Sequence, residues 1–263
     1  MTMSAARTAA PAFSAGRVFG RAAALIRSRG FVIAIGALLF LATLESASNW
    51  AVSTLDLHVL RHNRIPLGDS SLSLLQSVIV MVSEGMVTAW ITLLLIGDQI
   101  AGDRFDPLAA ARQVVTKVGP VTVLVLIFAA GFIGAMLLLV VPALILATAW
   151  CVGVPAMVAE DLSPRAAIAR SLTLTRGRRW SIFGLMLLPL GIGTLTNVVI
   201  MRLFRGGASA LVASKTPLLR FAVLPVLHSL EHAVIAALIA SIYVELVTLK
   251  EGSLKAGIAE VFG

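Results

Sequence analysis

Residues 118–159 form one apolar run that contains no Asp, Glu, Lys, Arg or His, and this run most constrains the fold. A helix needs about 17–25 apolar residues to cross the hydrocarbon core of a membrane, so the run is too long for one crossing. It fits two helices joined by a tight turn near Val140-Val141-Pro142. The run therefore predicts a helical hairpin in a membrane.

The composition agrees with this interpretation, because 59% of the 263 residues are hydrophobic and 13% are charged. A soluble domain averages about 45–50% apolar and about 25% charged residues. We expect an all-α polytopic membrane protein, with a disordered tail over 1–13 and one membrane domain over 14–263. The six expected membrane-spanning helices cover residues 31–50, 72–96, 119–138, 142–158, 181–201 and 221–249. For the first segment a cleaved signal peptide is the alternative, since Ser46-Ala47-Ser48 resembles a cleavage site, but the long basic region before it favours a retained helix.

The distribution of basic residues predicts the orientation. With the N-terminus in the cytoplasm, 15 of the 21 Lys and Arg residues lie in inside segments and 6 lie outside. Because Lys and Arg collect in cytoplasmic loops, we expect both termini on the inner side of a bacterial inner membrane. The formal net charge of +8 then indicates anionic lipid headgroups as partners, and not nucleic acid.

Three segments before expected spans have the pattern of amphipathic interfacial helices, at residues 14–29, 106–118 and 163–177. In the first, Val18, Phe19, Ala22, Leu25 and Ile26 share one face, and in the second Leu108, Ala111, Val114, Val115 and Val118 do so. Asp106-Pro107 and Ser163-Pro164 each place an N-cap acceptor before a proline at the first helical position. A basic helix followed by a two-span hairpin thus occurs three times, which predicts a threefold hairpin repeat. The alternative is that any cytoplasmic loop that enters a membrane has this pattern.

Several short matches suggest a family. They are Trp150, Val154-Pro155, Glu160, Ala169-Arg170-Ser171, Thr175-Arg176-Gly177 and Trp180, then Tyr243-Val244-Glu245-Leu246, Lys250-Glu251-Gly252 and Val261-Phe262. Together they resemble the bacterial family named after the membrane domain of glycerophosphoryl diester phosphodiesterase. The resemblance implies a multi-span membrane domain, which some proteins join to a soluble phosphodiesterase domain. We expect that catalytic domain to be absent, because the chain ends at Gly263 and has no His-Arg-Gly start.

The densest part of the resemblance is basic and lies on the expected cytoplasmic side. It predicts a headgroup-binding or structural network of Glu160, Arg170, Ser171, Arg176, Arg178, Arg179, Trp180 and Glu245. Glu245 is expected near the inner interface, with basic partners from the interfacial helices, such as Arg170 or Arg176. The sequence leaves open whether these residues hold the fold or bind a headgroup.

Polar residues inside apolar spans form a second candidate site, made of Glu84, His228, Glu231 and His232. Placing a charged side chain inside hydrocarbon costs roughly 2.5–3.5 kcal/mol of insertion free energy. Glu84 therefore has either a functional role, as a proton or cation relay or a ligand contact, or a structural role. As a structural group it would pair with Trp90, a Ser or a His on another helix. His228-Ser-Leu-Glu231-His232 has the order of inverzincin metalloenzymes, although no third ligand is identifiable.

The function expected from these patterns is a non-enzymatic membrane module, a scaffold or accessory protein that binds lipid or a protein partner. No cofactor or metal is expected, and Gly-x-x-x-x-Gly-Lys is absent, which argues against a self-contained ATP-driven pump. One alternative is a small transporter or lipid-translocating protein that uses Glu84 and a fifth span broken at Pro189, Gly191 and Gly193. The other is an intramembrane metalloenzyme at His228 and His232.

Overall fold

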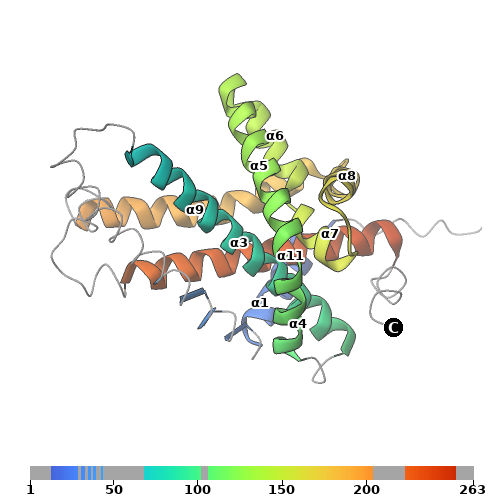
Figure 1. Cartoon of the computed structure of the whole chain (residues 1–263). Helices are drawn as coiled ribbons and strands as arrows, with labels where there is room; N and C mark the ends of the chain where they lie inside the picture. Colours follow the sequence, from blue (N-terminus) through green and yellow to red (C-terminus); the bar gives the residue numbers. More distant parts are fainter. Residues whose placement is uncertain are drawn as a thin grey trace, which may run out of the picture.

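The computed structural model describes residues 13–28, individual residues between 31 and 43, and residues 68–101, 106–203 and 223–252, and all elements in these ranges are helical. The helices are α1 (Ala15–Ile26), α3 (Gly68–Ala101), α4 (Pro107–Thr116), α5 (Val118–Leu138), α6 (Val140–Trp150), α7 (Gly153–Ala159), α8 (Pro164–Thr175), α9 (Arg179–Leu203) and α11 (Leu224–Glu251). Figure 1 shows their arrangement. The expected all-helical fold is confirmed for this part of the chain.

Four of these helical segments are long and apolar enough to cross a membrane. They are Ser77–Gln99, Val118–Leu138, Val140–Ala159 and Val226–Glu251. The expected fifth span corresponds to α9, whose apolar part, Arg179–Leu195, is shorter. The expected first span, 31–50, lies mostly outside the described residues, as does the expected tail. Six spans and a threefold repeat therefore stay predictions.

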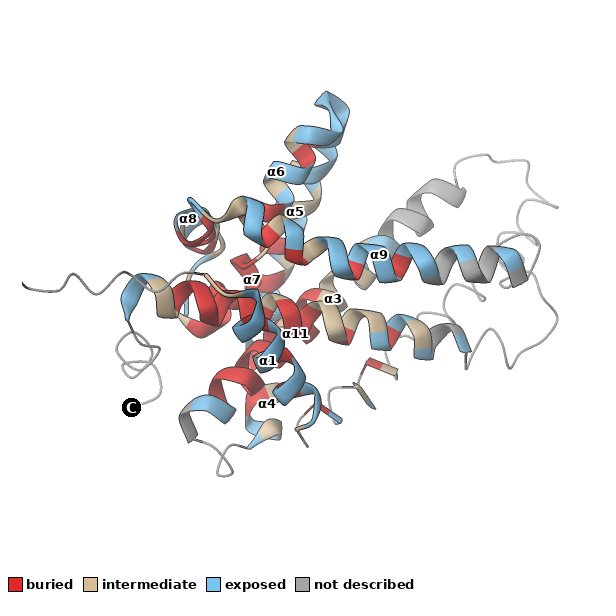
Figure 2. Cartoon of the chain, turned by 180° about the vertical axis from the view of Figure 1, so that it is seen from behind, coloured by how far each residue is buried: buried red, intermediate tan, exposed pale blue. Residues whose placement is uncertain are grey.

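The centre of the fold is the pair of long helices α3 and α11, which pack against each other and meet near the middle of Figure 1. The second half of α3 is deeply buried, as is the second half of α11, including the large side chains Ile91, Leu93, Ile242 and Tyr243. Figure 2 shows this core where α1, α3, α7 and α11 meet, while α9 and the far end of α5 and α6 are mostly exposed. The exposed apolar surface is what lipid-facing helices require.

The apolar run folds as the expected hairpin, and its turn is even tighter than predicted. Leu139, extended at φ −179° and ψ 160°, is the single residue between α5 and α6. The tip is apolar and open, with Leu137, Leu138 and Leu139 84%, 74% and 69% exposed. At the base, the Lys117 ammonium pairs with the Asp161 carboxylate, which joins the residues that flank the hairpin. Both ends of the hairpin therefore lie on the same side of the protein.

All three expected interfacial segments begin at a capped helix end. The Asp106 carboxylate accepts from the Leu108 N–H at 2.9 Å, and the Ser163 hydroxyl accepts from the Ala166 N–H at 3.4 Å. Ser14 makes the same kind of cap with the Arg17 N–H, although its sequence signal was not recognised. These bonds satisfy N–H groups that have no partner inside the helix.

The apolar faces predicted for α1 and α4 are each correct only in part. In α1, Val18, Ala22 and Leu25 are buried against the core, while Phe19 and Ile26 at the edges are exposed. In α4 the buried residues are Ala110 and Val114, whereas Leu108 and Val115 are exposed by more than half. The buried face of α4 therefore includes the predicted Val114 but is rotated away from Leu108 and Val115. α4 packs against α3 and α5 with the side that contains Ala110.

The expected break in the fifth span is absent, because α9 is one continuous helix with Pro189 inside it. A proline inside a helix removes one backbone hydrogen bond but leaves the helix able to continue past it. Gly193 lies where α9 approaches α11, since a Cβ added there would be 2.2 Å from Glu231 Oε1. The glycine thus permits close contact between two helices and does not interrupt one.

Candidate functional site

The first polar cluster joins α8 to the end of α11 through Glu160. Arg170 Nε donates to both Glu160 oxygens at 2.9 and 2.8 Å, and the Tyr243 hydroxyl donates to Glu160 Oε1 at 2.9 Å. Arg170 Nη2 also pairs with Glu251. Burial alone would lower the pKa of Arg170, but its hydrogen bonds to Glu251 and Glu160 outweigh burial and hold the pKa above its usual value. The cluster keeps its charges paired, which suits a structural role.

The second polar cluster attaches α1 to α11 through Glu245, whose side chain is only 1% exposed. Arg17 Nη2 lies 2.6 Å from Oε1, and Arg21 Nη1 lies 2.6 Å from Oε2. The Ser14 N–H also donates to Oε1 at 3.2 Å. Glu245 therefore has basic partners from an interfacial helix, as expected, but the helix is the first one. The expected pairing with Arg170 or Arg176 is wrong.

Ser171 has a packing role. Its buried hydroxyl donates to the Ala149 carbonyl at 2.8 Å, and the buried Thr175 hydroxyl lies 3.3 Å from the same oxygen. Ala149 lies near the end of α6, where the helix leaves C=O groups without partners inside the helix. The two hydroxyls of α8 satisfy one of them and so fix α8 against α6.

Another group of basic residues lies at a hollow between α8 and α9. We call Arg176, Arg178, Arg179, Lys250 and Trp180 the basic surface. A cavity of about 590 Å³ is lined by Leu172, Thr173, Arg176, Gly177, Arg179 and Trp180. The Lys250 ammonium donates to the Thr173 carbonyl beside it, and Arg176 and Arg178 lie close enough to repel its charge.

No carboxylate lies within ion-pair distance of Arg176, Arg178 or Arg179 among the residues that the structure describes. The Arg179 Nε–H is buried without a hydrogen-bond partner there. Trp180, at the start of α9, is 86% exposed. The basic surface thus differs from the two paired clusters, because its positive charge is not neutralised within the described part of the chain.

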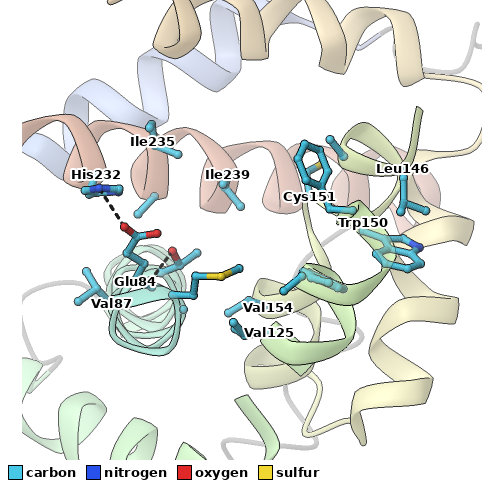
Figure 3. Close-up of a pocket in the computed structure, with 18 of the residues that line it drawn as sticks. Glu84, Val87, Val125, Leu146, Trp150, Cys151, Val154, His232, Ile235 and Ile239 are labelled. Carbon is cyan, nitrogen blue, oxygen red and sulfur yellow. Dashed lines mark hydrogen bonds and ion pairs between the residues drawn. The ribbon is translucent and has the colours of Figure 1, made fainter. Parts of the chain in front are cut away.

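The intramembrane residues are brought together only in part. Glu84 on α3 points toward His232 on α11, with Oε1 and Nε2 3.0 Å apart (Figure 3). Among the partners considered from the sequence, the structure thus selects a His on another helix. Trp90 has a different role, since its indole N–H donates to the Pro107 carbonyl at 3.0 Å.

The other members of the intramembrane set point elsewhere. Glu231 faces Gly193 on α9, while the ring of the exposed His228 lies beside that of His232 and is tilted by 45° from it, with centroids 5.8 Å apart. Successive helical residues are rotated by about 100°, so Glu231 and His232 face different neighbours. Within the described residues, no three His, Cys, Asp or Glu side chains come close enough to hold a metal ion.

Glu84 and His232 line a partly open cavity of about 490 Å³, to which α3, α5, α6, α7 and α11 contribute lining residues. The rest of its lining is almost entirely apolar and includes Phe128, Phe132 and Trp150. The Phe128 and Trp150 rings stack with centroids 5.2 Å apart. Sequence reasoning found Glu84 and His232 but missed the aromatic residues, because in a chain this apolar an aromatic residue does not mark a site.

Comparison with known proteins found no family model, no curated protein and no solved structure that matches the chain.

Proposed function

We propose that this protein is a non-enzymatic module of a bacterial inner membrane that binds anionic lipid headgroups at its basic surface and serves as a scaffold or accessory subunit. Both termini would be cytoplasmic, as the distribution of Lys and Arg predicts. The resemblance to the membrane domain of glycerophosphoryl diester phosphodiesterase is part of the same proposal. It concerns the architecture of a membrane domain and carries no phosphodiesterase activity.

The observation that carries the proposal is the contrast in charge pairing. Arg170, Arg17 and Arg21 each have a carboxylate partner, whereas Arg176, Arg178 and Arg179 have none among the described residues. Charges needed only for folding are normally paired where they are partly buried. Arg176 and Arg179 line the hollow, and Arg178 lies between them in the sequence. Such arginines are suited to a ligand with several negatively charged oxygens, because guanidinium groups bind phosphate in a bidentate manner.

Two further features favour a lipid headgroup over a soluble anion. Trp180 is exposed next to the arginines and opens an apolar helix, and tryptophan is enriched at the level of lipid headgroups. The basic surface also lies on the same side as the base of the α5–α6 hairpin, since α7 and α8 follow that hairpin directly. A phosphate at this level would meet the arginines while its acyl chains lie along α9.

The test compares two variants of equal net charge. In Arg176→Gln/Arg178→Gln/Arg179→Gln the basic surface is neutralised, and in the control Arg27→Gln/Arg112→Gln/Arg165→Gln three exposed arginines outside it are changed. Each basic residue near a membrane surface contributes about 1 kcal/mol, so the first variant should lose about 3 kcal/mol, or on the order of a hundredfold in affinity. The readout is retention of phosphatidylglycerol over phosphatidylcholine, measured by native mass spectrometry.

Equal retention in both variants and the unchanged protein would refute headgroup binding at this surface. Loss of a co-purifying protein from native membranes, without loss of phosphatidylglycerol, would instead indicate a protein partner. Both outcomes are read against circular dichroism spectra that show the same helix content.

Transport or lipid translocation is a second candidate, favoured by one observation, the presence of Glu84 in the wall of a 490 Å³ cavity. The continuous α9 gives this candidate no broken helix to use. Reconstituted protein that moves a fluorescent phospholipid between leaflets, and loses that activity in Glu84→Gln, would favour it. Equal rates with and without protein would remove it.

A further inference from the structure

The cavity between α3, α5, α6 and α11 has the size and lining of a site for a small organic molecule. Its volume of about 490 Å³ falls within the range of about 300–1,000 Å³ that such sites occupy. Its wall is mostly apolar, and its few polar residues include Thr88 as well as Glu84 and His232, which lie together in Figure 3. Such a site holds an apolar body and orients one polar group.

The charges that line the cavity define which polar group fits. Among the residues that the structure describes, its lining includes one carboxylate, Glu84, one imidazole, His232, and no Lys or Arg. A ligand with a carboxylate or phosphate group would meet the like charge of Glu84 in a surrounding of low dielectric. A cation at the same place would be attracted by Glu84, and His232 holds that carboxylate in position from the opposite helix.

The aromatic residues point to the same class of ligand. Phe128, Phe132 and Trp150 supply ring surfaces within the lining, and the faces of such rings attract organic cations as well as apolar groups. Gly131 and Gly153 keep two of these rings in place, because a Cβ at either position would lie 2.5 Å from Trp150 or Phe128. The aromatic side of the cavity is therefore closely packed before any ligand enters.

We propose that this cavity binds a hydrophobic organic cation, with its charge beside Glu84 and its apolar body against Phe128, Phe132 and Trp150. The inference goes beyond headgroup binding, since it concerns another site and the opposite sign of ligand charge. It does not depend on the proposed function of the basic surface.

The probes are tetraphenylphosphonium and tetraphenylborate, which have nearly the same shape and opposite charge. Binding of each is measured by equilibrium dialysis against the full chain in nanodiscs of neutral lipid, with empty nanodiscs as the baseline. We expect saturable binding of tetraphenylphosphonium to the protein and no saturable binding of tetraphenylborate. Saturable binding of both ions with similar affinity, or of neither, would overturn the proposal.

Variants then locate the site. Glu84→Gln should weaken tetraphenylphosphonium binding by on the order of tenfold or more, because it removes the attracting charge. The control Asp98→Asn changes an exposed carboxylate on the same helix, outside the cavity lining, and should leave binding unchanged. Phe132→Ala tests the ring surface without altering the Glu84–His232 pair and should also weaken binding. Unchanged affinity in Glu84→Gln and Phe132→Ala would place the binding elsewhere and refute this site.

The two proposals fail separately. The variant Arg176→Gln/Arg178→Gln/Arg179→Gln should keep its affinity for tetraphenylphosphonium, and Glu84→Gln should keep its phosphatidylglycerol. If either variant loses both ligands, that variant perturbs the fold. Phe132→Ala, with Asp98→Asn as its control, then tests whether tetraphenylphosphonium binds in the cavity.

Discussion

Replacing Gly131 by alanine should strain the contact between α5 and α6, because the added methyl group has no room. Its Cβ would lie 2.5 Å from Trp150 Cζ3 and 2.7 Å from Cη2, whereas carbon atoms in contact are normally about 3.5–4.0 Å apart. The Trp150 ring would have to move by about 1 Å. It cannot move alone, since it stacks on Phe128, and the Phe128 ring is itself in close contact with Gly153.

The expected magnitude follows from two opposing effects. Extra atoms in a packed core typically cost about 1–3 kcal/mol. Alanine in place of glycine stabilises a helix by about 1 kcal/mol, which partly offsets this cost. Gly134 on the same helix is the matched control, because nothing lies within 4 Å of a Cβ added there. Gly131→Ala should therefore be about 1–3 kcal/mol less stable than Gly134→Ala.

The assay is reversible unfolding of the detergent-solubilised protein by a denaturing detergent, followed by circular dichroism. The strain should disappear when Trp150 is truncated, so Gly131→Ala should no longer destabilise a protein that carries Trp150→Ala. If Gly131→Ala and Gly134→Ala have equal stability, or if the cost of Gly131→Ala persists without Trp150, the packing argument is refuted.

Two further predictions concern the paired clusters. Glu245→Gln removes the charge that holds Arg17 and Arg21, so α1 loses its ionic attachment to α11. We expect the free energy of unfolding to fall by about 1–3 kcal/mol and trypsin to cleave faster at these arginines. Unchanged cleavage would contradict this role. Tyr243→Phe removes one hydrogen bond to Glu160, while Arg170 stays paired with Glu160. The free energy of unfolding should therefore fall by about 1 kcal/mol in the same assay. An unchanged free energy would mean that the hydroxyl has no net effect on stability.

The features of this fold that follow from local sequence were predictable. The apolar run required a hairpin, and Asp106-Pro107 and Ser163-Pro164 marked two helix starts that the structure confirms. The hairpin turn was placed only a residue or so too late, at Val140-Val141-Pro142, because a proline in the first turn of a helix reads like part of a turn.

Features that depend on the rotation of a helix about its axis were not predictable. Tyr243 and Glu245 belong to the same short motif, yet their separation of two residues turns their side chains about 200° apart on α11. Tyr243 therefore faces Glu160, while Glu245 faces α1. The depth of Glu245 could be inferred from its distance along the helix, but which of three basic helices lies beside it depends on packing between segments far apart in sequence.

The same limit applies to the intramembrane site. The sequence identified Glu84 and a His as possible partners, but it gave equal weight to His228, Glu231 and His232 because they share one short motif. The structure separates them by rotation around α11, with His232 toward α3 and Glu231 toward α9. The cavity itself needs five helices from separate parts of the chain, and no pattern within one helix encodes it.

The hairpin of α5 and α6 also determines how the protein can respond to the thickness of its bilayer. Its charged groups, Lys117 and Asp161, lie at the base, whereas the exposed leucines at the tip include no residue that prefers water or headgroups. A helix with polar anchors at both interfaces must tilt or deform the bilayer when the thickness changes. This hairpin is held at one interface only, so its tip can end at different depths, and thinning or thickening of the opposite leaflet transmits little force to α3 and α11.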